Sequence, residues 1–390
     1  MQKAEKIRIR ILTPVHIGSG NKLTKGFDFF TTATSTYIVP LPVILAYYQT
    51  HPEHRFQLDQ GRFPLEQIQQ LRDPRIQRYE TPCTTSEILE FIKTPDGIPY
   101  IPGSSIKGAI RTAVLSQLFH HLQPRQQSEL LQTVQKNGRK SAAQEIEAQL
   151  LTTIDRNYAK SKQNRDLFRT LIVGDARFAR EDLDLYPVKS LELKSLEPQQ
   201  PSDCQWMKDK RPRGRDSLPK DTVIYPELLA QDAEATFTLR LDSTIGAGNG
   251  RKLQRNGFPT SIGELFQMLN AHARRMYELE TKFLKQCASF LNTAGADFLS
   301  VLREDVAVHF PSRQGTTRRC ILRLGWGIGW DSITGAIAKT VPEQFKRIRF
   351  QFTLGSRGAP FPKTHKIVCT ERMEPVSVLG WVLLERMGHD

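Results

Sequence analysis

Hydrophobic and polar residues alternate in three short stretches of the chain, which is the pattern of a half-buried β-strand. Residues 7–11 read IRIRI, so the isoleucines face one side and the arginines face the other. Residues 235–241 (ATFTLRL) and residues 347–352 (RIRFQF) repeat this alternation. The sequence therefore predicts one strand near the N-terminus, one in the middle of the chain and one towards the C-terminus, each with its apolar residues turned towards a core.

Other stretches carry apolar residues every three or four positions, which is typical of helices that pack on one face. Residues 40–50 predict a short helix, and residues 262–291 predict a long one. Residues 121–170 are rich in Gln, Lys and Glu with leucines at helical spacing, and we interpret them as a helical insertion. Residues 170–178 (TLIVGDARF) return to strand character.

The segment GIPYIPGSSIKGAIRTA, residues 97–113, predicts an extended turn followed by a helix. Ser104 or Ser105 is a suitable N-cap, because a serine hydroxyl accepts a backbone N–H at a helix start. Lys107 and Arg111 are four residues apart and share the face opposite the apolar one. Two cations beside the positive end of a helix dipole predict a seat for an anion, and a phosphate is the obvious candidate.

Glycine-rich segments that carry a cation follow each of the predicted strands. They are HIGSGNK (residues 16–22), IGAGNGRK (residues 245–252) and LGSRG (residues 354–358). Glycine allows backbone N–H groups to approach an anion closely, so several such loops could follow successive phosphates of one strand of RNA. The match between IGSGN and IGAGN, each after an alternating strand, indicates an internal duplication. The candidate RNA-binding residues are His16, Gly18, Ser19, Gly20, Lys22, Gly103, Ser104, Ser105, Lys107, Arg111, Arg251, Lys252 and Arg357.

Strands interrupted by single helices, without regular β-α-β alternation, favour an α+β fold. Two tandem ferredoxin-like (RRM-like) domains fit this order best. We expect a first domain at residues 1–200 with the helical insertion at 121–170, and a second domain at residues 222–390. Residues 201–221 between them are polar, basic and rich in proline, and they predict a linker or loop.

The charge balance points to a polyanionic partner. The 390 residues include 55 Lys and Arg against 41 Asp and Glu, a formal net charge of +14. Nucleic acid is the commonest partner of such a surface. We find no apolar run long enough for a membrane span and no signal peptide, and the five cysteines are scattered without a CxxC pair. Neither disulfides nor a zinc site is expected, and a reducing cytoplasm fits.

Sequence motifs of nucleotide-cofactor enzymes and hydrolases are incomplete or missing. In GAGNGRK, Arg251 stands where the dinucleotide fingerprint needs its third glycine. The sequence has no GK followed by Ser or Thr, and no GxSxG. Because these motifs hold phosphates or a nucleophile in those enzyme classes, we expect no nucleotide cofactor. We expect no metal because the cysteines are scattered, and no catalytic residue because no acid–base constellation is present.

The motifs LTPVHIGSG and IPYIPGSSIKGAIRTA resemble those of the RAMP superfamily of CRISPR effector proteins. Together with the length, VGDARF (residues 173–178) and LGWGIGW (residues 324–330) make the chain most similar to the fifth-subunit family of type III-A (Csm) complexes. The resemblance implies a non-catalytic subunit that binds the CRISPR RNA (crRNA), caps its 3′ end and supports crRNA maturation and antiviral defence. The implied partners are crRNA, target RNA near the crRNA 3′ region, the repeating backbone subunit, the small helical subunit and trimming nucleases, with no membrane.

Three alternatives remain open at this stage. A RAMP endoribonuclease would cut precursor or target RNA, with His16 as a possible base and a glycine loop at GIGWDSITGAI, in which Ile337 replaces the last glycine. A backbone subunit would use a loop aspartate and a metal, for which Asp28 is the candidate. A pure scaffold would bind protein only. The outward residues of IRIRI and RIRFQF are Arg and Gln, with no aromatic residue, which favours recognition of the RNA backbone with little sequence preference.

Overall fold

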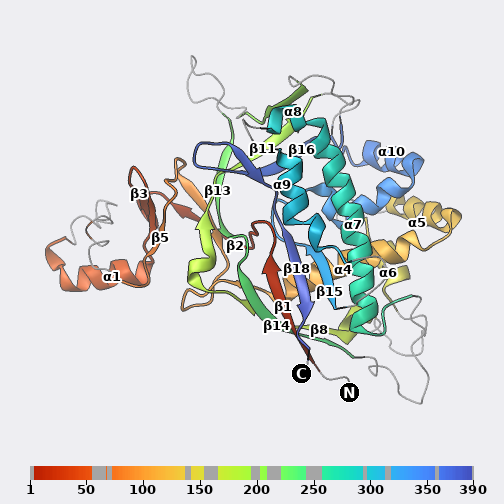
Figure 1. The fold of residues 1–390 in the computed structure, drawn as a ribbon, viewed down its shortest axis with the longest axis horizontal. Coiled ribbons are helices and arrows are strands. Elements are labelled where there is room, and N and C mark those ends of the chain that lie inside the picture. The colour runs from red at the N-terminus through yellow and green to blue at the C-terminus, as the bar shows by residue number, and fades with distance from the viewer. Residues whose placement is uncertain are drawn as a thin grey trace.

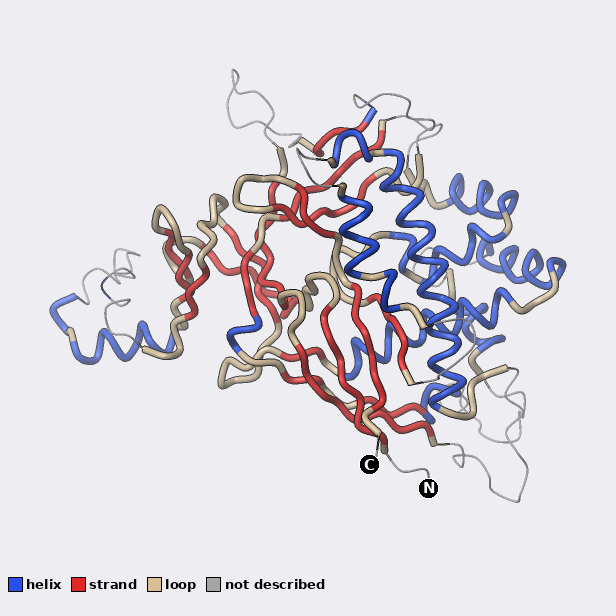
Figure 2. Tube along the Cα trace, viewed as in Figure 1, coloured by secondary structure: helices blue, strands red, loops and turns tan. Residues whose placement is uncertain are grey.

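Most helices lie on one side of the protein, and the strands lie beside them in the centre and on the other side, with one helix, α1 (Leu41–Thr50), at the far left of Figures 1 and 2. The computed structural model describes residues 4–54, 67, 73–136, 142–152, 166–194, 203–208, 221–242, 257–292, 297–311, 318–355 and 360–388. The mixture of helix and sheet confirms the α+β class. None of the described helices is both long enough and apolar enough to cross a membrane.

The main sheet has five antiparallel strands in the order β15-β18-β1-β14-β8. Its bounds are β1 (Glu5–Ile11), β8 (Leu171–Val173), β14 (Glu234–Leu241), β15 (Arg319–Arg323) and β18 (Trp381–Arg386). In the centre, Ile7 lies opposite Phe237 of β14, and Ile9 lies opposite Leu384 of β18. The alternation in β1 and β14 therefore places their apolar residues on the same face.

Two long helices cover that face. They are α4 (Gly103–His120) and α7 (Ile262–Gln286), which contribute Ile106, Ile110, Leu265 and Phe266 to the core beneath them. In chain order the elements run β1, α4, β8, β14, α7 and β18, a β-α-β-β-α-β arrangement with β15 added at the edge. One ferredoxin-like unit is thus assembled from segments along the whole chain.

The second sheet contains eight strands among the described residues, and part of it packs on α7, where Leu191 and Ile367 join Phe283 and Leu284. Its main path is β17-β16-β11-β13-β6-β2, with β10 on β13 and β12 on β11. The bounds are β2 (Gly18–Thr24), β6 (Glu87–Phe91), β10 (Leu183–Leu185), β11 (Val188–Leu193), β12 (Cys204–Trp206), β13 (Val223–Leu229), β16 (Thr364–Cys369) and β17 (Pro375–Ser377). Strand β2 lies at the end of this path, and β6 is its one paired neighbour within the described part of the chain.

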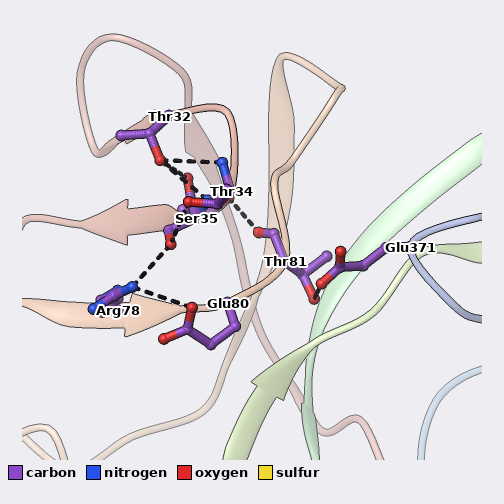
Figure 3. Close-up of polar contacts among 8 residues, drawn as sticks. Thr32, Thr34, Ser35, Arg78, Glu80, Thr81 and Glu371 are labelled. Carbon is purple, nitrogen blue, oxygen red and sulfur yellow. Dashed lines mark hydrogen bonds and ion pairs between the residues drawn. The ribbon is translucent and has the colours of Figure 1, made fainter.

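A small unit projects from the second sheet, at the left of Figure 1. It comprises β3 (Phe29–Thr31), β4 (Thr36–Ile38), β5 (Gln77–Tyr79) and α1 (Leu41–Thr50), with its own buried cluster around Tyr47 and Tyr48. Figure 3 shows its attachment. The Thr36 hydroxyl donates to the Thr81 carbonyl at 2.7 Å, and the Thr81 hydroxyl donates to Glu371 at 3.4 Å.

The remaining elements are short and surround these sheets. They are β7 (Tyr100–Ile101), β9 (Ala176–Arg177), α5 (Pro124–Lys136), α6 (Gln144–Leu150), α8 (Ala288–Leu291), α9 (Phe298–Asp305) and α10 (Pro342–Gln351). Helix α9 packs against the opposite side of the main sheet, where Phe298 and Leu302 join Trp381 and Leu383. Helices α5 and α6 confirm the helical character of the described part of residues 121–170.

Periodicity predicted many elements correctly. The strands at residues 7–11 and 235–241 are β1 and β14, and residues 170–178 contain β8 and β9. The helices at residues 40–50 and 262–291 are α1 and the pair α7 and α8.

Residues 347–352 form no strand. Residues 347–351 belong to α10, which begins at Pro342 and buries Ile348 while leaving Phe350 68% exposed, and Phe352 is its C-cap. Proline is favoured at the first helical position, and Phe345 and Ile348 are spaced to share one helix face. The short alternation of RIRFQF was therefore a coincidence within a helix.

The expected separation into domains 1–200 and 222–390 does not match the distribution of strands. Strand β1 lies between β14 and β18, and the second sheet likewise mixes strands from both halves of the chain. Part of the expected linker at 201–221 is ordered, because β12 (Cys204–Trp206) pairs with β11. Residues 209–220 lie outside the described part.

Candidate nucleic-acid interface

Close packing at the start of α4 is the reason for the glycine in IPGSS. A Cβ at Gly103 would lie 2.2 Å from the carbonyl oxygen of Val173, so only glycine allows the helix to begin against the end of β8. The N-cap residue is Pro102, and no side chain caps this end from within the helix. The expectation that Ser104 or Ser105 caps α4 is therefore wrong.

The anion at this helix start comes from the protein itself. The backbone N–H of Gly103 donates to Asp175 Oδ1 at 2.7 Å. A carboxylate is favourable beside the positive end of a helix dipole, for the same reason that a phosphate would be. The sequence contained a signal for this contact, since Asp175 lies in the VGDARF segment, but its spatial position could not be read from the chain.

Lys107 and Arg111 are likewise engaged inside the protein. Lys107 Nζ donates to the carbonyl of Leu171 at 2.7 Å, and burial lowers the pKa of this lysine. Arg111 pairs with Asp166 and with Glu147, each at 2.9 Å. The expectation that both cations lie on an open face of the helix is wrong. They join α4 to β8 and to the helical insertion.

We expect Arg111→Ala to destabilise the protein by about 1–3 kcal/mol, because it leaves two half-buried carboxylates without their shared partner. Arg111 also lies over the ring of Phe168, with Cζ 5.1 Å from the ring centroid. Thermal unfolding followed by circular dichroism measures this loss. As a control, Arg125→Ala removes an exposed arginine paired within α5 and should change stability by about 0.5 kcal/mol at most. An Arg111 variant that melts like wild type but binds RNA more weakly would restore the phosphate interpretation.

The HIGSGNK segment is a strand where a loop was expected. Residues Gly18–Thr24 form β2, whose pairing with β6 is irregular between Gly18 and Lys22. Gly20 has a φ of 95°, a left-handed conformation that favours glycine. The side of β2 away from β6 has no paired strand among the described residues, and Gly18, Gly20 and Asn21 are exposed. Glycine backbone at such an edge is open to an external acceptor.

Side chains of β6 hold this edge in place. Ser19 Oγ donates to Glu90 Oε2 at 2.7 Å, and Asn21 Nδ2 donates to the same oxygen at 3.1 Å. Lys22 Nζ lies 2.7 Å from Glu87 Oε2, and both side chains are more than half exposed. Exposed ion pairs contribute little to stability, so Lys22 can exchange Glu87 for another anion at low cost. Sequence reasoning missed both glutamates.

His16 lies beneath this edge and not on it. The residue is 2% exposed, and its Nδ1 lies 2.7 Å from the carbonyl oxygen of Glu227. Burial lowers the pKa of His16, so the imidazole is neutral near pH 7. The rings of Phe91 and Trp326 contact its edges. The expectation that His16 contacts RNA is therefore corrected to a structural position in the core.

The glycine segment of the nuclease alternative, residues 327–337, directly follows a residue that is bonded to this histidine. The backbone N–H of Trp326 donates to the backbone carbonyl of His16 at 2.8 Å. The next residue, Gly327, is closely packed, because a Cβ there would lie 2.6 Å from the Leu379 side chain. Asp28 closes a turn, since its Oδ2 accepts the N–H of Thr24 at 2.7 Å. Among the described residues, no three His, Cys, Asp or Glu side chains are grouped to hold a metal ion.

The predicted residues do not all meet in one cluster. Lys22 lies on the second sheet, whereas Lys107 bonds to an edge strand of the main sheet. Arg251, Lys252 and Arg357 lie outside the described residues, as does the IGAGN segment on which the duplication rests.

Comparison with protein families gives a match over more than half of the chain. A family model described as the RAMP superfamily matches residues 8–243. Two curated relatives from Mycobacterium tuberculosis, strains CDC 1551 / Oshkosh and ATCC 25618 / H37Rv, are each 28% identical and named "CRISPR system Cms protein Csm5". Each match covers 30% of this chain and 40% of the relative, so it spans less than half the length of those proteins.

Solved structures are similar over nearly the full length. One is a chain of the cryo-EM structure of a Csm-crRNA-target RNA ternary complex in a type III-A CRISPR-Cas system, with a TM-score of 0.59 and 21% identity over 98% of this chain and 100% of that one. Another is the crystal structure of T. onnurineus Csm5, with a TM-score of 0.59 and 20% identity over 96% and 99%. This likeness establishes a shared fold.

Proposed function

The chain belongs to the RAMP superfamily, and we propose that it is a non-catalytic, crRNA-binding subunit of a type III-A CRISPR effector complex. The observation that carries this proposal is the likeness along nearly the whole chain to a chain of a Csm-crRNA-target RNA complex, supported by the two Csm5 relatives. The net charge of +14 fits an RNA partner.

In this proposal the chain caps the 3′ end of the crRNA and supports its maturation. Its partners are the crRNA, target RNA near the crRNA 3′ region, the repeating backbone subunit, the small helical subunit and trimming nucleases, in the cytoplasm. The burial of His16 argues against the RNA-cutting alternative, because a general base must reach the proton that it removes.

We assign the RNA contact to the open edge of β2. Gly18, Gly20 and Asn21 expose backbone there, Ser19 supports them, and Lys22 supplies the positive charge. Glycine backbone with a neighbouring lysine suits a phosphate group and reads no base, which agrees with a subunit that accepts any guide sequence. Arg251, Lys252 and Arg357, which were predicted from sequence, are proposed as further contacts. Lys107 and Arg111 are not retained.

Opposite charge changes at one ion pair test this assignment. Lys22→Gln should weaken binding of single-stranded RNA about fivefold and lower the salt slope by about one, because one phosphate contact is lost. Glu87→Gln should strengthen binding by a few-fold, because it frees Lys22 and removes a repelling carboxylate. Fluorescence anisotropy over a series of salt concentrations measures both effects.

The two variants also separate binding from stability. If the Lys22–Glu87 pair acted only within the protein, both substitutions would break it equally. RNA affinity would then be unchanged in both variants, or would change in the same direction in both. Equal effects of Lys22→Gln and Glu87→Gln on RNA affinity would remove β2 from the interface.

A further inference from the structure

A cavity of about 380 Å³ opens on the helical side of the protein, away from β2. It lies between α4, α7 and the 3-10 helix η10 (Thr334–Thr340). Its volume falls within the range of about 300–1,000 Å³ that is typical of small-molecule sites. The polar and charged residues that face it include Ser116, His120, His272, Arg275, Lys282 and Thr340.

Two of these side chains carry buried nitrogens without a hydrogen-bond partner. His272 is 9% exposed, and its Nδ1 has no partner among the described residues. Arg275, three residues further along α7, has a buried Nε that also lacks one. Buried polar groups in folded proteins are nearly always paired, so two unpaired ones beside a single cavity require an explanation.

Basic groups outnumber acidic ones around these nitrogens. Burial, followed by the nearby Arg275 and His120, lowers the pKa of His272 to about 3. Burial also lowers the pKa of Arg275. Glu278 is the one acidic residue of the lining and is exposed, and Lys339 is already paired with Asp331 at 2.5 Å. A bound anion would supply the counter-charge that the Arg275 guanidinium lacks.

The rest of the cavity is apolar. Leu279, Ile333 and Ala336 form a wall beside the basic groups, and Ile333 is 46% exposed. A partner's carboxylate side chain would satisfy the charge but leave most of the volume empty. A nucleotide meets both requirements, because its phosphate accepts hydrogen bonds only and its base has a flat apolar face.

We propose that this cavity binds the phosphomonoester group of a nucleotide, either a free mononucleotide or the terminal nucleotide of an RNA strand. Arg275 and His272 face the phosphate, His120 stays bonded to Ser116 and Thr340 beside them, and the apolar wall receives the base. The site is independent of the RNA contact proposed at β2, since it is formed by other elements on the helical side.

Isothermal titration calorimetry with uridine monophosphate (UMP) tests this site on the full chain. We expect UMP to bind at least about tenfold more tightly than uridine, because charge-assisted hydrogen bonds to the phosphate are lost without it. Arg275→Gln should weaken UMP binding about tenfold or more. Lys285→Gln, an exposed change on the same helix outside the cavity lining, should leave it unchanged.

Short oligoribonucleotides separate the two sources of the phosphate. Strands that end in a 5′-phosphate, a 3′-phosphate or only hydroxyls are compared for Arg275-dependent binding. Preference for UMP identifies a free nucleotide, and preference for one phosphorylated strand identifies an RNA end. The two proposals can fail separately. Arg275→Gln should abolish binding in the cavity, whereas the effect of Lys22→Gln on RNA affinity should not depend on Arg275.

Stability provides a second readout. His272→Phe removes the unpaired nitrogen, so we expect it to raise the Tm of the free protein while abolishing the rise in Tm caused by UMP. If His272 had a purely structural role, His272→Phe would instead lower the Tm of the free protein. The proposal is wrong if neither UMP nor any phosphorylated strand binds at millimolar concentration, or if Arg275→Gln binds them as wild type does.

Discussion

Gly103→Ala is expected to destabilise the protein by about 3 kcal/mol or more, enough to unfold much of the population near physiological temperature. Its Cβ would lie 2.2 Å from the Val173 carbonyl oxygen and 2.9 Å from that of Gly174. Both are backbone atoms, so the methyl group can be accommodated only if α4 moves away from β8. The move would also weaken the bond from the Gly103 N–H to Asp175. Thermal and urea unfolding measure the change.

The same helix contains a matched control. A Cβ at Gly108 meets no atom within 4 Å, and the residue is exposed. Gly108→Ala should therefore stabilise the protein by about 0.5–1 kcal/mol, since alanine restricts the unfolded chain and favours helix. If the two substitutions had equal effects on stability, close packing would not be the reason for Gly103.

A buried carboxylate joins α7 to three strands. Glu280 accepts hydrogen bonds from Trp381 Nε1 at 2.7 Å and from Arg323, and its Oε1 lies 2.6 Å from His365 Nε2. Its side chain is 1% exposed. Burial alone would raise the pKa of Glu280, but Arg323, His365 and Trp381 hold it below its ordinary value of 4.5. The carboxylate is therefore ionised in the folded protein at neutral pH.

Glu280→Gln should destabilise the protein by about 3–5 kcal/mol, because it keeps the shape but leaves the Arg323 charge buried and unpaired. Chemical unfolding at pH 7 measures this loss. Glu278→Gln, an exposed change two residues earlier in α7, should alter stability by about 0.5 kcal/mol at most.

Acid provides an independent check on Glu280. A carboxylate whose folded pKa lies below its unfolded value contributes stability above the unfolded pKa and loses it as the pH falls through the folded pKa. Wild type should thus lose this contribution below about pH 4.5, whereas Glu280→Gln has none to lose. Parallel pH dependence of the two proteins would contradict the ionised network.

Elements whose periodicity extends over many residues could be predicted from the sequence. Helix α7 and strands β1 and β14 follow directly from apolar spacing. Short patterns were ambiguous, as in α10, where five or six residues fit strand and helix alike. Strand β2 was missed because glycine is disfavoured in strands, and its position at a sheet edge is a property of the fold.

The candidate site shows more clearly which contacts cannot be predicted from sequence. Residue types predicted cations near a helix start, but the partners of Lys107 and Arg111 lie 36 to 64 positions away in the chain. Only the fold brings Asp166 and Glu147 to Arg111 and so converts an expected ligand site into a structural one. By contrast, Gly18, Gly20 and Lys22, which were predicted to bind RNA, are exposed, and their contact with RNA stays a prediction.

Sequencing of the RNA that co-purifies with this chain tests the central claim most directly. The tagged protein is expressed with the other subunits of its complex and a precursor crRNA, and both ends of the recovered RNA are mapped. The account predicts guides with a common 5′ repeat tag and defined 3′ ends, which blur in the Lys22→Gln variant. Recovery of no RNA would contradict it, as would RNA with random ends or specific cleavage of guide or target by the purified chain alone.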